Sequence, residues 1–156
     1  MTYADYRAKT AEIANSLPVF WAFSEEQFDK ELAKRGITRK SAPKKLYSFP
    51  MGGFYLRSDA DKVKKYYEDM ANAKKELVSL MENEEGFAYE AFEYEMYNHE
   101  YPINWQGDWD VCSCFGKCEY GDGKYGEDYL KELGFSNKVI KEYAKASRAV
   151  RANGDW

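Results

Sequence analysis

Hydrophobic positions recur at helical spacing over most of this 156-residue chain. Residues 2–17 form the first predicted helix, which ends at Pro18 because proline cannot continue a helix. Ser24 opens a second helix, with Gln27 three residues later in the arrangement of a capping box. Between the two helices, the apolar run over residues 19–23 predicts a buried connector.

A short hairpin and four further helices complete the predicted elements. Segments 45–49 and 54–57 flank the sequence Pro50-Met51-Gly52-Gly53, whose glycines suit a tight hairpin turn. Further helices are predicted at about residues 58–82, 87–98, 127–133 and 137–150. The pattern therefore predicts an α+β fold, a mostly helical single domain over residues 1–156 with one small β-hairpin.

A long segment without helical periodicity, residues 100–126, contains every cysteine of the chain. Together with the only histidine, the cysteines form the pattern His-x12-Cys-x-Cys-x3-Cys, made by His99, Cys112, Cys114 and Cys118. Structural zinc takes four ligands in a closed tetrahedron, and Cys3His is one standard set. The sequence therefore predicts one structural Zn²⁺ that pins the loop at about residues 99–118.

Other interpretations of this cluster remain open. Three free thiols and a surface histidine could fall together without a metal, and Cys112 with Cys114 could form a redox pair. Enzyme signatures are lacking: the chain has neither a phosphate-binding loop nor a nucleophile elbow. The zinc-deaminase signature is not matched either, because Glu100 follows His99 directly. We therefore expect no enzymatic activity.

Charge is distributed unevenly along the chain. Residues 76–116 contain ten acidic residues and no Lys or Arg; because the whole chain has 23 basic and 27 acidic residues, the rest carries a net +6. A solvated acidic helix that aids solubility is one explanation. The alternative is an acidic surface that meets a basic protein partner. The residues assigned to that surface are Glu90, Glu93, Glu95, Asp108 and Asp110.

Composition narrows the class of protein further. Aromatic residues make up 17% of the chain, far more than a disordered chain would carry. No run approaches the ~18 apolar residues of a membrane span, and the polar N-terminus lacks a secretory segment. We therefore expect a cytoplasmic protein with no membrane contact. The end of the chain, Asp155 and Trp156, is expected to be a frayed tail.

Three phrases of the sequence carry a resemblance to a known group of proteins. They are Leu17-Pro18-Val19-Phe20-Trp21-Ala22-Phe23-Ser24, Gly52-Gly53-Phe54-Tyr55 and Asn98-His99-Glu100-Tyr101. Over residues 1–130 the chain resembles a family of small proteins from phages and mobile elements of gut bacteria, mostly of unknown function. In that family the segment around His99 is usual and the cysteine cluster is not. A zinc-bearing protein of this kind also resembles the type II anti-CRISPR proteins.

The resemblance implies a function that agrees with the charge distribution. RNA-guided Cas nucleases hold nucleic acid in strongly basic channels. We therefore expect an inhibitor that binds a type II Cas nuclease in the host cytoplasm and blocks target DNA loading, without binding nucleic acid itself. The alternative is a zinc-stabilised mobile-element protein that binds nucleic acid or a replication protein. Its basic residues would be Arg39, Lys40, Lys44 and Lys45, or Lys138, Lys141, Lys145, Arg148 and Arg151. A third class, a thiol oxidoreductase, would use the cysteines.

Overall fold

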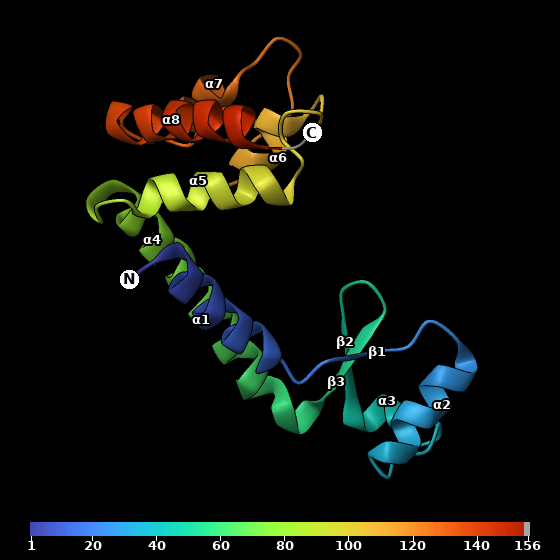
Figure 1. Cartoon of the computed structure of the whole chain (residues 1–156). Coiled ribbons are helices and arrows are strands. Elements are labelled where there is room, and N and C mark those ends of the chain that lie inside the picture. The colour runs from blue at the N-terminus through green and yellow to red at the C-terminus, as the bar shows by residue number, and fades with distance from the viewer. Residues whose placement is uncertain (155–156) are drawn as a thin grey trace. The chain divides into compact units, whose positions relative to one another are not determined.

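The computed structural model describes residues 1–154, so the expected fraying of residues 155 and 156 lies outside it. It confirms a mostly helical α+β fold with a small antiparallel sheet (Figure 1). The elements are α1 (Tyr3–Asn15), β1 (Phe20–Trp21), α2 (Glu25–Lys34), α3 (Ala42–Lys45), β2 (Leu46–Phe49), β3 (Gly53–Leu56), the 3-10 helix η1 (Arg57–Asp59), α4 (Ala60–Asn83), α5 (Phe87–Asn98), α6 (Gly107–Ser113), α7 (Gly126–Glu132) and α8 (Asn137–Asn153).

Residue contacts divide the chain into two compact units. Unit 1 comprises Met1–Lys9 and the chain from Asn72 onward, and unit 2 comprises Thr10–Ala71. The boundaries fall inside α1 and α4, so each of these helices contributes residues to both units. The single domain expected from the sequence stays a prediction.

Unit 2 contains the predicted hairpin and one strand that the sequence analysis missed. β2 and β3 pair antiparallel, and β1 pairs with the other edge of β3 to give the order β1-β3-β2. Residues 20 and 21, expected in a connector, form β1, with Phe20 opposite Phe54. Two residues are too few to show the alternation that identifies a strand. Phe20 is buried, as expected for the connector, and packs with Leu32 and Leu46.

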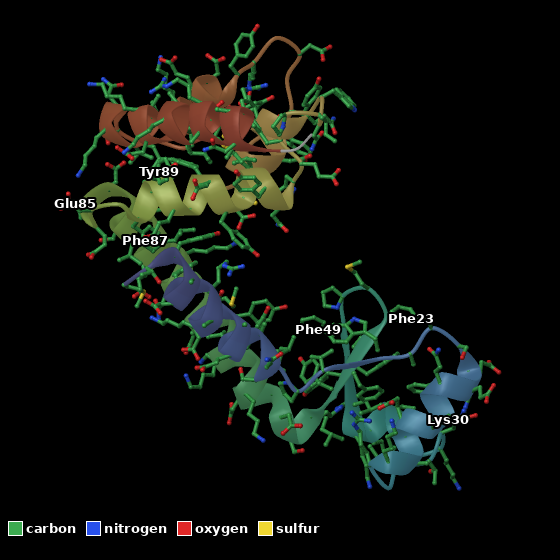
Figure 2. The ribbon with its side chains drawn as sticks, in the orientation of Figure 1. Phe23, Lys30, Phe49, Glu85, Phe87 and Tyr89 are labelled. Atoms are coloured by element: carbon green, nitrogen blue, oxygen red, sulfur yellow. The ribbon has the colours of Figure 1, made fainter. Side chains whose placement is uncertain are left out.

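The local signals at α2 and at the hairpin turn act largely as predicted. The Ser24 hydroxyl caps α2 by accepting a hydrogen bond from the Gln27 backbone N–H at 3.1 Å. The Gln27 side chain accepts from the Phe23 backbone N–H, one residue earlier than in a capping box. Phe23 itself is exposed (Figure 2). In the turn, Met51 and Gly52 both have positive φ, at 63° and 79°, and only the glycine adopts this region without steric cost.

Unit 1 is built around α5, which packs along α8 with α6 and α7 beside them (Figure 1). Phe92 and Met96 of α5 are completely buried and place one side of this helix in the core of unit 1. At the start of α5, Phe87 lies edge-on to the rings of Tyr3 and Tyr6 from α1 (Figure 2). Because α5 also packs against α6, its C-terminal end lies beside the cysteine segment of unit 1.

The segment expected to be a loop over residues 100–126 contains a helix, α6. Its seven residues carry too few apolar positions to show helical periodicity, so the sequence did not reveal it. Gly107, its first residue, permits a close approach, because a Cβ there would lie 2.7 Å from the Tyr101 carbonyl oxygen. Val111 and Cys112 face the core of unit 1, so α6 is held by burial.

Within residues 1–154, none of the helices combines the length and the apolar character that a membrane crossing requires.

Candidate metal centre

The end of α5 brings two metal-binding side chains onto one face of the helix. Glu95 and His99 are four residues apart, and side chains at that spacing lie one above the other. His99 is the C-cap of α5, and its Nε2 atom lies 3.6 Å from Glu95 Oε2. The Asn104 side-chain amide donates a hydrogen bond to the His99 carbonyl oxygen, and this bond fixes the backbone of His99 at the end of α5.

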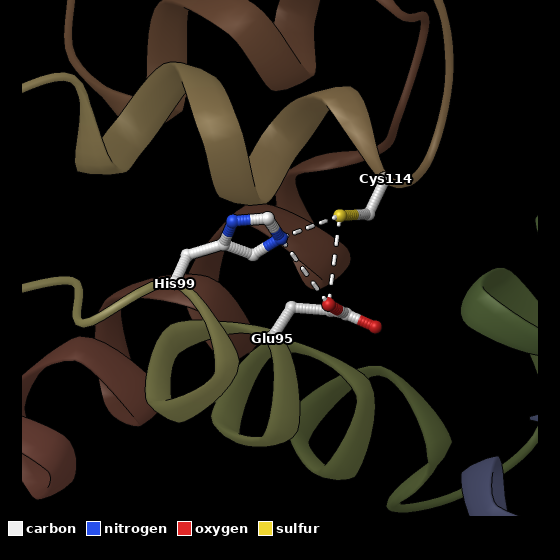
Figure 3. Close-up of side chains that lie close together, drawn as sticks. All are labelled: Glu95, His99 and Cys114. Atoms are coloured by element: carbon white, nitrogen blue, oxygen red, sulfur yellow. Dashed lines mark hydrogen bonds and ion pairs between the residues drawn. The ribbon is translucent and has the colours of Figure 1, made fainter.

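Cys114, which follows α6, supplies the third side chain of the group. Its Sγ atom lies 3.4 Å from His99 Nε2 and 3.5 Å from Glu95 Oε2 (Figure 3). The end of α5 and the residue after α6 therefore point one carboxylate, one imidazole and one thiol at a common centre. Within residues 1–154, these three are the group of His, Cys, Asp and Glu side chains that could hold a metal ion.

The three separations lie within about 0.2 Å of the edges of a tetrahedral zinc site. Zinc lies ~2.3 Å from thiolate sulfur and ~2.0–2.2 Å from imidazole nitrogen or carboxylate oxygen, which places sulfur about 3.5–3.6 Å from the nitrogen or oxygen and places those two about 3.3–3.5 Å apart. The observed separations of Cys114, His99 and Glu95 are 3.4, 3.5 and 3.6 Å. In the metal-free protein the same separations allow a thiol hydrogen bond to Glu95. The group can therefore receive an ion with little movement of its side chains.

Glu95 is buried in this group and is held by neutral donors. Among the described residues it is the only buried charged one, with 7% of its surface exposed. The Tyr3 hydroxyl donates to Oε1 at 2.6 Å, and the Asn98 amide donates to Oε2 at 3.2 Å. Burying a carboxylate costs free energy unless hydrogen bonds or a cation compensate. Glu95 is therefore not part of an exposed partner surface, which corrects its assignment from the sequence.

Burial and negative charge also act on the Cys114 thiol. Burial of the side chain, together with the neighbouring Glu95 carboxylate, raises the pKa of Cys114 to about 12. The metal-free thiol is therefore protonated at neutral pH. A divalent cation would reverse this preference, because a coordinating thiol is deprotonated by the charge of the ion.

The remaining two cysteines of the predicted zinc set lie outside this group. Cys112 is completely buried, and its Sγ atom lies 3.7 Å from the Gly126 carbonyl oxygen. Cys118 is partly buried, with its Sγ atom 3.5 Å from the Ser113 hydroxyl. The structure thus brings together His99 and Cys114 from the predicted set, with Glu95 as the third residue.

The other acidic residues assigned to partner binding are at least partly accessible. Glu90 is exposed and accepts a hydrogen bond from the Tyr3 backbone N–H, while Glu93 accepts from the Tyr89 hydroxyl. Asp108 accepts from the Tyr143 hydroxyl, and Asp110 accepts from the Asn104 amide. Neutral donors satisfy these carboxylates without cancelling their charge.

The sequence analysis missed Glu95 as a ligand, although a signal for it was present. A Glu four residues before a His, at the end of a predicted helix, is a spacing that places both on one face. Because Cys and His dominate structural zinc sites, the sequence pattern places this carboxylate on the acidic surface instead.

The comparisons with known proteins identify a family and nothing more specific. Residues 2–118 match a family described as a family of unknown function, DUF7659. The matched region includes Glu95, His99 and Cys114. No curated protein and no solved structure matches the chain. A family of unknown function agrees with the expected resemblance, whereas the phage origin and the likeness to anti-CRISPR proteins stay predictions.

Proposed function

The chain belongs to the family DUF7659, whose function is unknown, and we propose that it binds one Zn²⁺ through Glu95, His99 and Cys114. The observation that carries the proposal is the triangle of ligand atoms with edges of 3.4, 3.5 and 3.6 Å. One oxygen, one nitrogen and one sulfur ligand form a set that suits zinc better than the hard cations calcium and magnesium, which take oxygen.

The proposed role of the ion is structural. It would join the end of α5 to the residue after α6, and so hold in place the segment between them. Cys118 follows Cys114 by four residues and is more accessible than Cys112, which is completely buried. Cys118 is therefore the candidate for the fourth ligand of a closed site.

Metal analysis of purified variants tests this ligand set. We expect one zinc per chain in the wild type and loss of zinc in Cys114→Ser and His99→Ala. Cys112→Ser is the matched control and should keep its zinc, because its thiol lies outside the group. Loss of zinc in Cys112→Ser together with full retention in Glu95→Gln would instead support the Cys3His set. Three titratable thiols and no metal in the wild type would refute the site.

As a second function, we propose that unit 1 binds a basic protein partner and thereby inhibits a type II Cas nuclease. The specific observation is a face of α5 formed by Glu90, Glu93, Tyr94 and Tyr97, which we call the acidic α5 face; these residues line a depression of about 450 Å³. Tyr94 and Tyr97 are 39% and 44% exposed, and exposed tyrosine is typical of binding hot spots.

This face already holds a guanidinium group from within the protein. The guanidinium carbon of Arg7 lies 3.5 Å from the ring centre of Tyr94. An aromatic ring flanked by carboxylates attracts arginine and lysine side chains. The same chemistry would favour the basic channel of a nuclease and disfavour phosphate.

Titration into a cleavage reaction tests the inhibitor proposal. With a reconstituted type II Cas nuclease and its guide RNA, inhibition of target DNA cleavage should saturate near one inhibitor per nuclease. The variant Glu90→Lys/Glu93→Lys should lose inhibition while remaining folded. A control with the same charge change, Glu12→Lys/Glu68→Lys, alters exposed residues of unit 2 and should inhibit like the wild type. Salt-dependent binding to plain DNA without inhibition would favour the nucleic-acid alternative.

A further inference from the structure

A second site in unit 1 is a pocket of about 720 Å³ beside the metal group. Its walls come from α4, from α6 and the residues that follow it, and from the end of α7. Cys114 belongs both to this pocket and to the metal group. The volume lies within the range of about 300–1,000 Å³ that is typical of sites for small molecules.

The floor of the pocket is apolar. Leu77 of α4 and Phe115 after α6 are buried there, and Leu133 closes the side against Gly116. A Cβ on Gly116 would lie 2.6 Å from a methyl group of Leu133, so glycine allows this close packing. Val78, one residue after Leu77, is 45% exposed at the pocket and offers apolar surface to a ligand.

The loop that forms one wall is held in place by a hydrogen bond. Trp109 Nε1 donates to the Cys118 carbonyl oxygen at 2.9 Å, which ties the segment after α6 back onto that helix. Both residues line the pocket. This hydrogen bond therefore links two parts of the pocket wall to each other.

Positive charge gathers at this pocket, although the adjoining sequence is acidic. Lys74, Lys75 and Lys117 line it, and they are the lysines that bracket the acidic segment 76–116. No carboxylate lies within ion-pair distance of these three lysines among residues 1–154, whereas Lys124 and Lys131 nearby in sequence are paired. An anion bound here would therefore meet ammonium groups whose charge is not already neutralised.

We propose that this pocket binds a small anionic amphiphile, a molecule with one carboxylate, sulfonate or phosphate group on an aromatic or aliphatic body. The body would lie on Leu77, Val78 and Leu133, and the anionic group would contact Lys74 or Lys117. The three lysines determine the ligand class. They would not attract a neutral ligand, and they would repel a cationic one. This binding is independent of the inhibitor function proposed above.

Fluorescence titration with 8-anilinonaphthalene-1-sulfonate tests the proposal, using the purified full chain. We expect saturable binding of one molecule per chain. The neutral analogue N-phenyl-1-naphthylamine, which has the same body without the sulfonate, should bind at least about tenfold more weakly.

Variants of the pocket separate specific recognition from binding to loosely packed protein. Lys74→Ala/Lys117→Ala should weaken binding of the sulfonate about tenfold and leave binding of the neutral analogue unchanged. Val78→Glu, at an exposed position, should weaken both probes. The matched control, Lys138→Ala/Lys141→Ala, removes two exposed lysines of α8 and should bind like the wild type. Equal binding of both probes by the wild type, or equal weakening by the control, would overturn the proposal.

Discussion

His99 Nε2 lies 3.6 Å from Glu95 Oε2 at the end of α5, one helical turn away along the same face. The Cys114 thiol meets both side chains from the other segment. Glu95 is buried, and without a metal only hydrogen bonds offset the free-energy cost of burying its carboxylate.

Tyr3 should strengthen zinc binding, because its hydroxyl donates a hydrogen bond to Glu95 Oε1 at 2.6 Å. Tyr3→Phe keeps the ring but removes the donor that orients the proposed ligand. Loss of such outer hydrogen bonds weakens metal binding about 10–100-fold. Competition with a chromophoric chelator would measure the zinc affinity. Tyr94→Phe serves as the control, because that ring lies outside the metal group; equal zinc affinity in Tyr3→Phe and the wild type would contradict the proposed orientation by Tyr3.

Removal of the metal should lower the stability of unit 1. A ligand that binds only the folded state at 100 times its Kd stabilises the fold by about 2.7 kcal/mol. Calorimetry with and without a chelator should therefore show a lower Tm for the stripped wild type. Cys114→Ser should melt at the same temperature under both conditions. If the chelator does not change the Tm of the wild type, then Glu95, His99 and Cys114 form a hydrogen-bonded group that holds no metal.

Gly107 should resist substitution although it lies in a helix. In Gly107→Ala, the new Cβ would lie 2.7 Å from the Tyr101 carbonyl oxygen, so the backbone must shift. Overpacking of this kind costs about 1–3 kcal/mol, which urea unfolding would measure. Gly121→Ala is the matched control, because its Cβ would meet the flexible Lys124 side chain. Similar unfolding free energies for both variants would show that α6 can move away from Tyr101.

Alkaline pH should destabilise the protein through Tyr143. Burial raises the pKa of Tyr143 above its usual value of 10.0. The folded state therefore keeps the phenol neutral while the unfolded state ionises, so stability is complete below pH 10 and falls as the pH rises further. Between pH 8 and pH 10.5 this residue alone should cost roughly 0.8 kcal/mol. Over this pH interval, the free energy of unfolding should decrease less in Tyr143→Phe than in the wild type. An equal decrease in both proteins would show that other groups cause the loss of stability at alkaline pH.

Local sequence patterns predicted most of the secondary structure. The bounds of α5 agree with residues 87–98, because Gly86 and the apolar positions of this helix act locally. The hairpin was also predicted, since Gly52 adopts the positive φ that glycine tolerates in a turn. β1 and α6 were missed because each is short and is held by packing: Phe20 is buried in unit 2, and Val111 in unit 1.

By itself, the sequence determined that His99 and Cys114 belong to one cluster, because cysteine and histidine are rare in this chain and close together in it. Only the tertiary structure decided which side chains meet. α6 buries Cys112 against Gly126 and leaves Cys114 facing α5, where Glu95 lies one turn before His99. Spacing along a chain cannot specify this choice, because the direction of each side chain depends on how α6 rotates when it packs against the core.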